Sequence, residues 1–304
     1  MNEFDGVLPV YKPAGMTSHD VVAKCRRLLK MKRIGHTGTL DPSVTGVLPL
    51  CLGRATRMVE YLQEMPKEYR AVLKLGIATD TEDLTGTVVE RMDVVEVREE
   101  RMREVLEEFR GPIMQTPPMY SAVKVDGKRL YELAREGKTV ERKARQVSIH
   151  ELELTGFESL DQPEASLRVL CSKGTYIRTL CVDIGARLGV PSAMAELKRT
   201  LSAGIGVDRC LTFEEIERRM EEGTLEEALL RADKAASHMP EHVVDERKLE
   251  NALRGQKLPA WAVLPSAEGA QEQFRLYAPD DRFIGIYKWD EEAGKIVPVK
   301  VFLP

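Results

Sequence analysis

The sequence predicts a mixed α/β domain, with a largely antiparallel sheet flanked by helices, followed by a small β-barrel-like module. Three observations predict this fold class. The length of 304 residues is ample for one large or two ordinary domains. Helical patterns alternate with hairpin-like pairs of strands, which favours a mixed sheet over a doubly wound parallel one. After residue 237, short strand patterns separated by turn residues are typical of a small barrel.

The first 75 residues contain the predicted elements that surround a glycine-rich loop. Thr17 or Ser18 is placed to cap a helix, because apolar residues then recur at helical spacing. Polar and apolar residues alternate at 67–75, which is typical of a half-buried strand. In order, we expect a strand at 6–12, a helix at 18–30, a buried strand or strand–helix junction at 47–52, a helix at 55–62 and a strand at 67–75.

The middle of the chain combines polar loops with short elements. An acidic stretch at 96–110 has the spacing of an amphipathic helix, and Gly111-Pro112 ends it. Asp126-Gly127 is a hairpin turn signal. We expect a polar loop at 76–86, strands at 87–90 and 120–125, and a short helix at 130–135.

The remaining elements complete the mixed domain and form the C-terminal module. We expect strands at 146–155 and 165–171, a glycine turn leading into a helix that runs to 188, and a short helix at 193–197. A Glu-rich helical stretch at 211–236 can serve as a linker, because the composition changes there. Beyond it we expect a helix at 246–253 and strands at 261–264, 274–277, 283–289 and 296–303.

Composition describes a globular protein with an uneven charge distribution. The net charge is −4, which taken alone argues against a nucleic-acid partner. Basic residues are nevertheless in excess at 1–80 and 124–145, whereas acidic residues are concentrated at 81–110 and 211–233. Such segregation permits a basic face on an acidic protein, and a basic face is what a polyanion such as RNA requires.

Cysteine usage and hydropathy indicate a cytoplasmic protein without a membrane segment. The five cysteines are scattered and form no C-x-x-C pair, which argues against a zinc site and against a disulfide framework. No apolar run approaches the ~20 residues that span a bilayer, and the N-terminal pattern is not that of a signal peptide.

The most unusual stretch is the glycine-rich loop around Asp41. Gly35, Gly38 and Gly46 permit close backbone approach to a ligand. Pro42 fixes its own φ and favours an extended Asp41, so that one carboxylate is held at a rigid corner. An ordinary turn would explain the same residues. The loop lacks Gly-Lys-Ser/Thr and is therefore not a phosphate-binding P-loop.

Four other side chains are candidates for chemistry. His36 can act as a base, a metal ligand or a hydrogen-bonding wedge, although no second ligand stands at metal spacing and we expect no metal. Tyr69 also suits a packing role in a strand. Tyr176 and Arg178 lie on the same side if their segment is extended. Arg178 could then pair with a buried carboxylate and keep it ionised.

Four short blocks contain these residues in a fixed order. They are Lys12-Pro13-x-Gly15-x-Thr17-Ser18, Gly35-His36-x-Gly38-x-Leu40-Asp41-Pro42, Lys67-x-Tyr69-Arg70 and Ser172-Lys173-Gly174-Thr175-Tyr176-Ile177-Arg178-Thr179-Leu180. Together they resemble the TruB-type tRNA pseudouridine synthases over about residues 5–210. The tail, with Leu253-Arg254-Gly255 and the strands after it, resembles a PUA-like RNA-binding module more weakly.

The resemblance implies the pseudouridine synthase fold and the isomerisation of uridine 55 in the T-loop of tRNA, without a cofactor. Asp41 would act as nucleophile at C1′ or at the base, or as a base at C2′. Tyr69 would lie against the uracil, Tyr176 would line its pocket and Arg178 would pair with Asp41. Leu197 would close the uracil site. His36 would help to displace the base from the T-loop.

The resemblance also implies how RNA is bound. Phosphates of the T-arm stem-loop would contact basic side chains from the first helix, its exit and the second helix, namely Arg26, Arg27, Lys32, Arg33 and Arg57. Residues 1–232 would form the catalytic domain, with an RNA-contacting insertion at 81–145, and residues 237–304 would form the PUA-like domain. Nothing demands more than a monomer, and the chain looks bacterial.

Two other functions are compatible with the same motifs. The protein could bind or fold tRNA by trapping a flipped base without essential catalysis, since a fold serves several functions. It could also be a guide-RNA-dependent relative that modifies ribosomal RNA. A complete set of site residues argues against the first alternative, and a compact C-terminus with a bacterial-looking insertion at 81–145 argues against the second.

Overall fold

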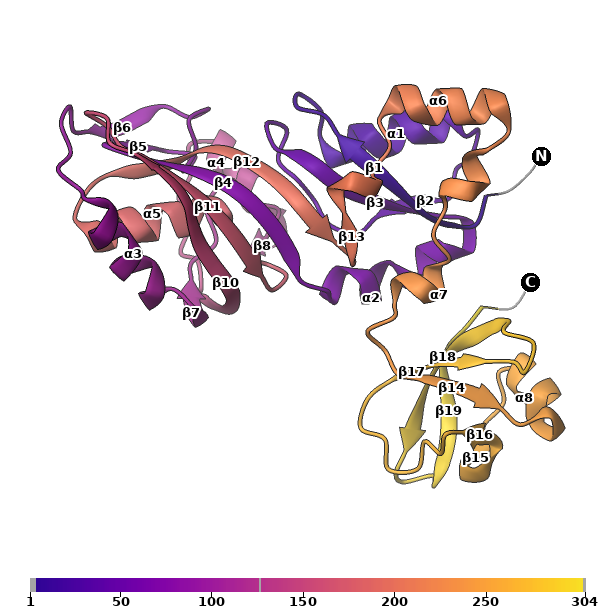
Figure 1. Cartoon of the computed structure of the whole chain (residues 1–304). Coiled ribbons are helices and arrows are strands. Elements are labelled where there is room, and N and C mark those ends of the chain that lie inside the picture. Colours follow the sequence, from indigo (N-terminus) through magenta and orange to yellow (C-terminus); the bar gives the residue numbers. More distant parts are fainter. Residues whose placement is uncertain (1–3, 126, 303–304) are drawn as a thin grey trace.

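The computed structural model describes residues 4–125 and 127–302, and it contains two main sheets (Figure 1). A nine-stranded sheet is built from strands in the first 206 residues, and a six-stranded sheet from strands after residue 240. The predicted fold class, a mixed α/β fold followed by a small β-module, is confirmed.

The nine-stranded sheet has the order β1-β3-β12-β4-β11-β10-β7, with β2 paired to β3 and β13 to β12. Every neighbouring pair is antiparallel except β3 and β12, which run parallel. Its strands are β1 (Gly6–Lys12), β2 (Ile34–His36), β3 (Thr45–Leu52), β4 (Lys67–Leu75), β7 (Gly111–Gln115), β10 (Arg145–Glu158), β11 (Glu164–Cys171), β12 (Ser192–Ser202) and β13 (Ile205–Gly206).

The helices begin and end where the local sequence favours it. Thr17 caps the first one through a reciprocal pair of hydrogen bonds with Asp20, and the left-handed Gly189 ends α5. The α-helices are α1 (Ser18–Leu28), α2 (Val59–Glu64), α3 (Glu99–Glu108), α4 (Leu130–Arg135), α5 (Ile177–Leu188), α6 (Phe213–Glu222), α7 (Ala232–Ala235) and α8 (Leu249–Leu253). Short 3-10 turns are η1 (Gly53–Met58), η2 (Val207–Arg209), η3 (Leu225–Ala228), η4 (Glu246–Lys248) and η5 (Ala260–Ala262).

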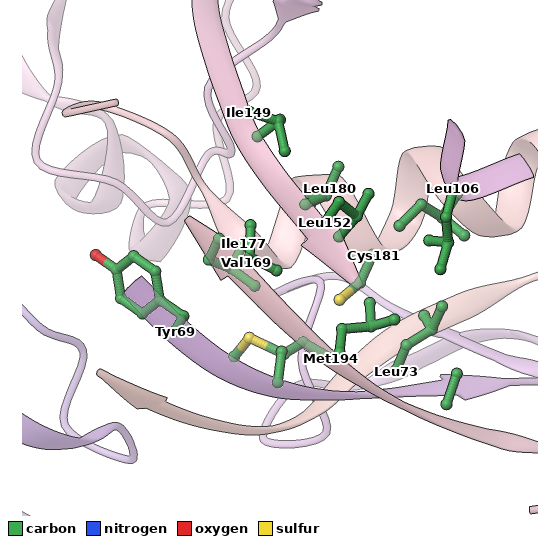
Figure 2. Close-up of a cluster of buried hydrophobic side chains, with 14 of the residues drawn as sticks. Tyr69, Leu73, Leu106, Ile149, Leu152, Val169, Ile177, Leu180, Cys181 and Met194 are labelled. Atoms are coloured by element: carbon green, nitrogen blue, oxygen red, sulfur yellow. The ribbon is translucent and has the colours of Figure 1, made fainter. Parts of the chain in front are cut away.

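The main core lies between the sheet and helices α3 and α5. Figure 2 shows side chains from both helices and from β4, β10, β11 and β12 meeting there. Tyr69 lies at one end of this cluster, and its hydroxyl points away from the apolar side chains (Figure 2). The core therefore holds the Tyr69 ring rigidly and presents only its polar tip to the space beyond.

The predicted helix at 193–197 is wrong, because these residues belong to the long strand β12. Alanine, methionine, glutamate and leucine favour helices, but their propensities amount to tenths of a kcal/mol per residue. The hydrogen bonds of β12 with β4 along one edge and with β3 along the other outweigh that preference. A propensity reading could not detect this long-range pairing.

The Glu-rich stretch at 211–236 is not a free linker. Phe213 and Ile216 of α6 are buried in the cluster that contains apolar residues of α1. Leu211 and Leu230 form isolated bridges with Val10 and Val7 of β1. The glutamates lie on the outer side of an amphipathic helix whose apolar face covers the first sheet.

Residues 76–145 also differ in part from the prediction. The expected loop begins with β5 (Ile77–Thr79), which pairs with β6 (Val88–Arg91). The expected strand at 120–125 is mostly turn, and only β8 (Lys124–Val125) pairs with β9 (Lys128–Arg129). Asp126, part of the predicted hairpin turn, lies outside the described residues.

The predicted helix at 55–62 is a 3-10 turn followed by α2.

The six-stranded sheet curls around its own core, in the order β15-β19-β18-β17-β14-β16 (Figure 1). Its strands are β14 (Glu241–Val244), β15 (Leu258–Pro259), β16 (Val263–Leu264), β17 (Phe274–Tyr277), β18 (Phe283–Asp290) and β19 (Lys295–Val301). The sequence pattern missed β14 and the very short β15. An open, curled sheet of this kind is compatible with a PUA-like module.

The two sheets are joined by a mixed apolar and polar contact. Ile286 of β18 packs in a cluster with residues of β1, β3, η1 and α2. Asp233 of α7 accepts hydrogen bonds from Arg231 at 2.8 Å and from the Tyr277 hydroxyl at 2.9 Å. Arg275 donates to the Asp233 carbonyl and to the Tyr277 hydroxyl. Because these buried polar groups are hydrogen-bonded, the bonds offset the free-energy cost of removing the groups from water.

Candidate active site

A cavity of about 350 Å³ opens where the glycine-rich loop meets the ends of β4 and β12. Its walls come from five segments that are distant in sequence, which is how loops and strand ends of a rigid sheet build a binding site. The lining includes Thr37–Asp41, Val44, Gln63, Lys67, Tyr69, Tyr120–Ala122, Ser172–Arg178, Leu197 and Arg199.

Lys12 holds the loop that carries Asp41 through hydrogen bonds to its backbone. The Lys12 ammonium donates to the carbonyls of Pro13 at 2.9 Å, Pro42 at 3.1 Å and Val44 at 2.6 Å. Its side chain is fully buried, and burial lowers the pKa of Lys12 to about 8. Three carbonyl acceptors satisfy its three donors, so the corner at Asp41 is fixed.

Arg178 forms an ion pair with Asp41 on the opposite side of the loop. Its Nη2 lies 3.0 Å from Asp41 Oδ2. The same guanidinium donates to the Thr81 carbonyl at 2.9 Å and to the Tyr120 carbonyl at 2.8 Å. Arg178 therefore ties the carboxylate to two further loops, a geometry that a planar five-donor group can satisfy.

The backbone around Arg178 differs from the extended segment considered in the sequence. Arg178 lies in the first turn of α5, and Tyr176 is the extended residue that precedes this helix. Both nevertheless line the cavity. They do so because the chain turns at Gly174, whose φ of +79° is a left-handed conformation that glycine adopts without strain.

The electrostatic balance at Asp41 has opposing contributions. Burial by the surrounding protein is the largest and raises the pKa of Asp41, while the neighbouring Arg178 lowers it. Solvent still reaches 42% of the side chain, because the cavity is open on one side. The carboxyl group is therefore less solvated than one on a surface, and the Arg178 guanidinium opposes the rise in its pKa that burial causes.

Tyr69, Tyr176 and Leu197 also line the cavity, as the sequence predicted. Tyr69 is 9% exposed, and burial raises the pKa of its hydroxyl. Leu197 stands in β12, opposite Ala71 in the adjacent β4. An aromatic and an aliphatic side chain thus frame a space in which a planar ring can reach Asp41.

His36 is the predicted site residue that the structure leaves outside the cavity lining. It ends β2, and its Nδ1 accepts a hydrogen bond from the Gly38 amide at 3.2 Å. Burial lowers the pKa of His36, which favours the neutral ring. In this structure it shapes the start of the glycine-rich loop.

The predicted RNA-contacting arginines and lysine fall into two groups. Arg26, Arg27, Lys32 and Arg33 lie exposed on α1 and its exit, and Arg26 also donates to the Ile34 carbonyl. Arg57 is engaged elsewhere, because its guanidinium donates to the Val301 carbonyl at 2.5 Å and stacks over Phe302. The sequence could not show that the C-terminal strand would reach η1.

Three buried residues at the site received no role from the sequence, although Lys67 stands in one of the motif blocks. Arg199 of β12 and Lys67 of β4 line the cavity, and burial lowers the pKa of Lys67 to about 8. The Gln115 carboxamide donates to the carbonyl of Tyr176 at 3.0 Å and accepts from its amide at 2.8 Å. Polar residues inside strands resemble surface positions, so only their neighbours in space reveal them.

Neither a metal cluster nor a membrane helix is found in the described residues. No group of three or more His, Cys, Asp or Glu side chains within 4–125 and 127–302 is arranged to hold a metal ion. In the same part of the chain, no helix is long and apolar enough to cross a bilayer.

Comparison with known families places the chain next to proteins that act on RNA. Residues 26–177 match the TruB family pseudouridylate synthase N-terminal domain, and residues 178–236 match the tRNA pseudouridylate synthase B C-terminal domain. The chain is 45% identical to tRNA pseudouridine synthase B of Bacillus velezensis, over 98% of each chain. It is 46% identical to the protein of that name from Geobacillus thermodenitrificans, over 98% of this chain and 99% of the relative.

Solved structures show the same architecture. The chain superposes on a chain from a crystal structure of a Cbf5-Nop10-Gar1 complex with a TM-score of 0.77 and 29% identity, covering 98% of this chain and 85% of that one. A chain from an H/ACA RNP bound to a substrate RNA containing 2′-deoxyuridine gives a TM-score of 0.75 and 26% identity, with the same coverage.

Proposed function

Because the chain belongs to the TruB family of pseudouridine synthases, we propose that it converts uridine 55 in the T-loop of tRNA into pseudouridine. The relatives at 44–46% identity are tRNA pseudouridine synthases, and the likeness extends over nearly the full length. The observation that carries the proposal is the Arg178–Asp41 ion pair at the wall of a cavity that Tyr69 and Leu197 also line.

The reaction requires only groups that this chain supplies. The N1–C1′ bond breaks, the uracil turns within the cavity, and C5 forms a bond to C1′. The C5 proton then leaves, while N1 gains a proton, so the product is an isomer of the substrate. No electrons are transferred to or from an external group.

Asp41 is the nucleophile or base of this reaction. It can attack C1′ of the ribose, attack the base, or remove the proton at C2′, and the same geometry serves all three. Arg178 keeps the carboxylate ionised and fixes its direction. Lys12 donates to the Pro42 and Val44 carbonyls, which fixes the backbone next to Asp41 and so keeps the carboxylate oxygen in position.

The cavity must receive a base that has been flipped out of the T-loop. Tyr69 would lie against the uracil, Tyr176 would line its edge, and Leu197 would close the site on the other face. His36, at the start of the loop, would help to displace the base. Enclosing a single base in this way is how enzymes reach atoms hidden in a stacked nucleic acid.

Exposed cations on α1 and its exit would bind the RNA backbone. Arg27, Lys32 and Arg33 project from α1 and its exit, and we assign them to phosphate contacts together with Arg26. The insertion at 81–145 would contact the T-arm, and residues 237–304 would form a PUA-like module that adds affinity. Arg57 is no longer assigned to RNA, since it holds the C-terminal strand.

Two further points complete the proposal. We infer a monomer, because each cavity is complete within one chain. We also place the protein in the cytoplasm, where tRNA is processed in the bacteria from which its relatives come. A guide-RNA-dependent activity is less well supported, since the Cbf5 structures are 26–29% identical to the chain.

The proposal is tested by tritium release from a T-loop stem-loop labelled at uracil C5. The wild-type chain should release tritium, because the label leaves only when the base is isomerised. Asp41→Asn should release none while binding the same RNA within about tenfold, since the carboxamide keeps the shape but cannot act as nucleophile. Turnover by this variant would refute the role of Asp41, and binding without tritium release by the wild type would refute catalysis.

A further inference from the structure

Arg199 is a buried cation in the cavity wall to which no role has been given above. Its side chain is 1% exposed, in the strand β12. Within the described residues it forms no ion pair with a carboxylate, and its hydrogen-bond acceptors are two backbone carbonyls. An arginine buried without a counter-charge is costly, so its position calls for a function.

The guanidinium contacts both ends of the loop that carries Asp41. Its Nε donates to the Val47 carbonyl at 2.7 Å, and its Nη2 donates to the Gly38 carbonyl at 3.2 Å. Gly38 precedes Asp41 and Val47 follows it, so the Arg199 side chain links the two ends of the loop. These two bonds use only part of its donors.

The remaining contact is with Tyr69. Arg199 and Tyr69 stand directly opposite each other in the paired strands β12 and β4. The neighbouring Arg199 guanidinium lowers the pKa of the Tyr69 hydroxyl, although burial of the ring raises that pKa more strongly. The other charged or titratable neighbours of this hydroxyl are Cys171 and Asp41.

We propose that Arg199 is the positioning residue that enables Tyr69 to accept the C5 proton of the rearranged uracil. This inference rests on the proposed function. In the last step the C5–H bond breaks and its electron pair forms the C5=C6 double bond. The proton passes to the Tyr69 oxygen, whose own hydroxyl proton moves on to water, and N1 takes up a proton from solvent.

A cation at Tyr69 assists this step because negative charge develops on the phenolic oxygen as it exchanges protons. Beside a buried hydroxyl, a fixed guanidinium stabilises that charge more than mobile solvent would. A lysine at position 199 keeps the charge but cannot reach two carbonyls and the phenol together. Arg199→Lys and Arg199→Gln should therefore both slow proton removal from C5.

The experiment separates proton removal from the earlier steps by comparing two substrates. In RNA containing 5-fluorouridine, C5 carries no proton, so the base can be detached and rejoined but Tyr69 has nothing to accept. For Arg199→Lys, tritium release from C5-labelled uridine RNA should fall at least about tenfold. Consumption of the 5-fluorouridine substrate in a single turnover should stay within about twofold of wild type.

Four outcomes decide the matter. An equal loss of rate with both substrates would show that Arg199 only holds the Asp41 loop in place, and this would overturn the proposal. Wild-type tritium release by both variants would overturn it too, whereas absence of release by the wild type itself would refute the proposed function. A rise of the C5-deuterium isotope effect in Arg199→Lys, with wild-type thermal unfolding, would support it even if Arg199→Gln does not fold.

Arg168→Gln is the matched control. Arg168 lies in the neighbouring strand β11 but pairs with glutamates on the outer face of the sheet, away from the cavity lining. Removing it deletes one arginine from the same sheet without touching Tyr69. Both substrates should react at wild-type rates.

Discussion

At the scale of single residues, the site depends on cations that hold a carboxylate in a fixed position. Arg178 bonds Asp41 and two backbone carbonyls from other loops, and Lys12 bonds three carbonyls around the same corner. The carboxylate is thus oriented before any substrate arrives, which is where much of the catalytic advantage of an enzyme lies.

The pH dependence of catalysis should report the Arg178–Asp41 pair. Burial raises the pKa of Asp41 and Arg178 lowers it, so replacing Arg178 by Gln should raise that pKa further. The acidic limb of the single-turnover rate, which rises as Asp41 ionises, should move to higher pH. Measuring the rate from pH 4.5 to 8 checks this, and an unmoved limb would contradict it.

Arg178→Lys provides the comparison for that measurement. It retains the positive charge, so the acidic limb should stay near that of wild type. The rate at its plateau should still fall strongly, because an ammonium cannot serve Asp41 together with the carbonyls of Thr81 and Tyr120.

The sequence predicted this site unevenly at the residue scale. Asp41 could be found because glycines and a proline mark its loop, and Tyr69, Tyr176 and Arg178 because they stand in motifs. Arg199 and Gln115 could not, because each lies in a strand and its partners are tens to more than a hundred residues away in the chain. His36 has a conspicuous motif position yet does not line the cavity.

At the scale of elements, β12 unites the sheet. It is antiparallel to β4 and parallel to β3, so it joins the strands that carry the Asp41 loop to those that carry Tyr69. The close approach needs glycine at one point. A Cβ on Gly46 would lie 2.1 Å from the Arg199 carbonyl oxygen, and Gly46 has a φ of +108°.

Gly46→Ala should therefore lower the unfolding free energy by more than about 3 kcal/mol. The added Cβ would displace the backbone of Arg199, and alanine would also be strained at this positive φ. Gly189→Ala is the matched control. Its φ of +78° is also left-handed, but nothing lies within 4 Å of the added Cβ, so strain alone should cost about 1 kcal/mol. Urea denaturation measures both, and equal losses would contradict the steric argument.

Elements with local signals were predictable and those set by distant pairing were not. The capped helix α1 and the alternating strand β4 appear where the pattern places them. The residues of β12 have helical propensity, and β14 is a four-residue strand that is defined by its pairing with the later strands β16 and β17, so neither was recognised. Strand pairing in these cases is decided by neighbours that the local sequence does not contain.

At the scale of the whole molecule, the C-terminal sheet is fastened to the rest of the chain. Lys300 forms an ion pair with Glu60, and Arg57 bonds the Val301 carbonyl. Behind these contacts, Asp233 accepts hydrogen bonds from Arg231 and Tyr277. The module that we propose to bind RNA is thereby held in one orientation relative to the cavity.

Asp233→Asn should loosen this connection. The loss of a nearly buried carboxylate weakens the hydrogen bonds that it accepts from the Tyr277 hydroxyl and from Arg231, which keeps its pair with Asp281, and this should lower stability by about 2 kcal/mol. Calorimetry should then resolve a separate, earlier transition for the C-terminal sheet. Asp280→Asn breaks an exposed pair with Arg282 and should leave stability nearly unchanged, because solvent screens that pair; a similar loss in both variants would contradict the prediction.

A mixed α/β fold followed by a small β-module was predictable, but the connection between the two sheets was not. The change in composition at 211–236 suggested a linker. The apolar face of α6 shows that residues 211–230 still cover the first sheet. The contact of Arg57 with the C-terminal strand joins residues more than 240 positions apart, and no local pattern encodes it.

A ribosome delivers the chain from its amino end, and β12 is the last long strand of the nine-stranded sheet to emerge. Until residue 202 is available, the strands beside the Asp41 loop and those beside Tyr69 have no shared partner. A chain that ends before β12 therefore lacks the strand between the Asp41 loop and Tyr69, together with Leu197 and Arg199 of the cavity wall. We expect the cavity to form only once this strand has been synthesised.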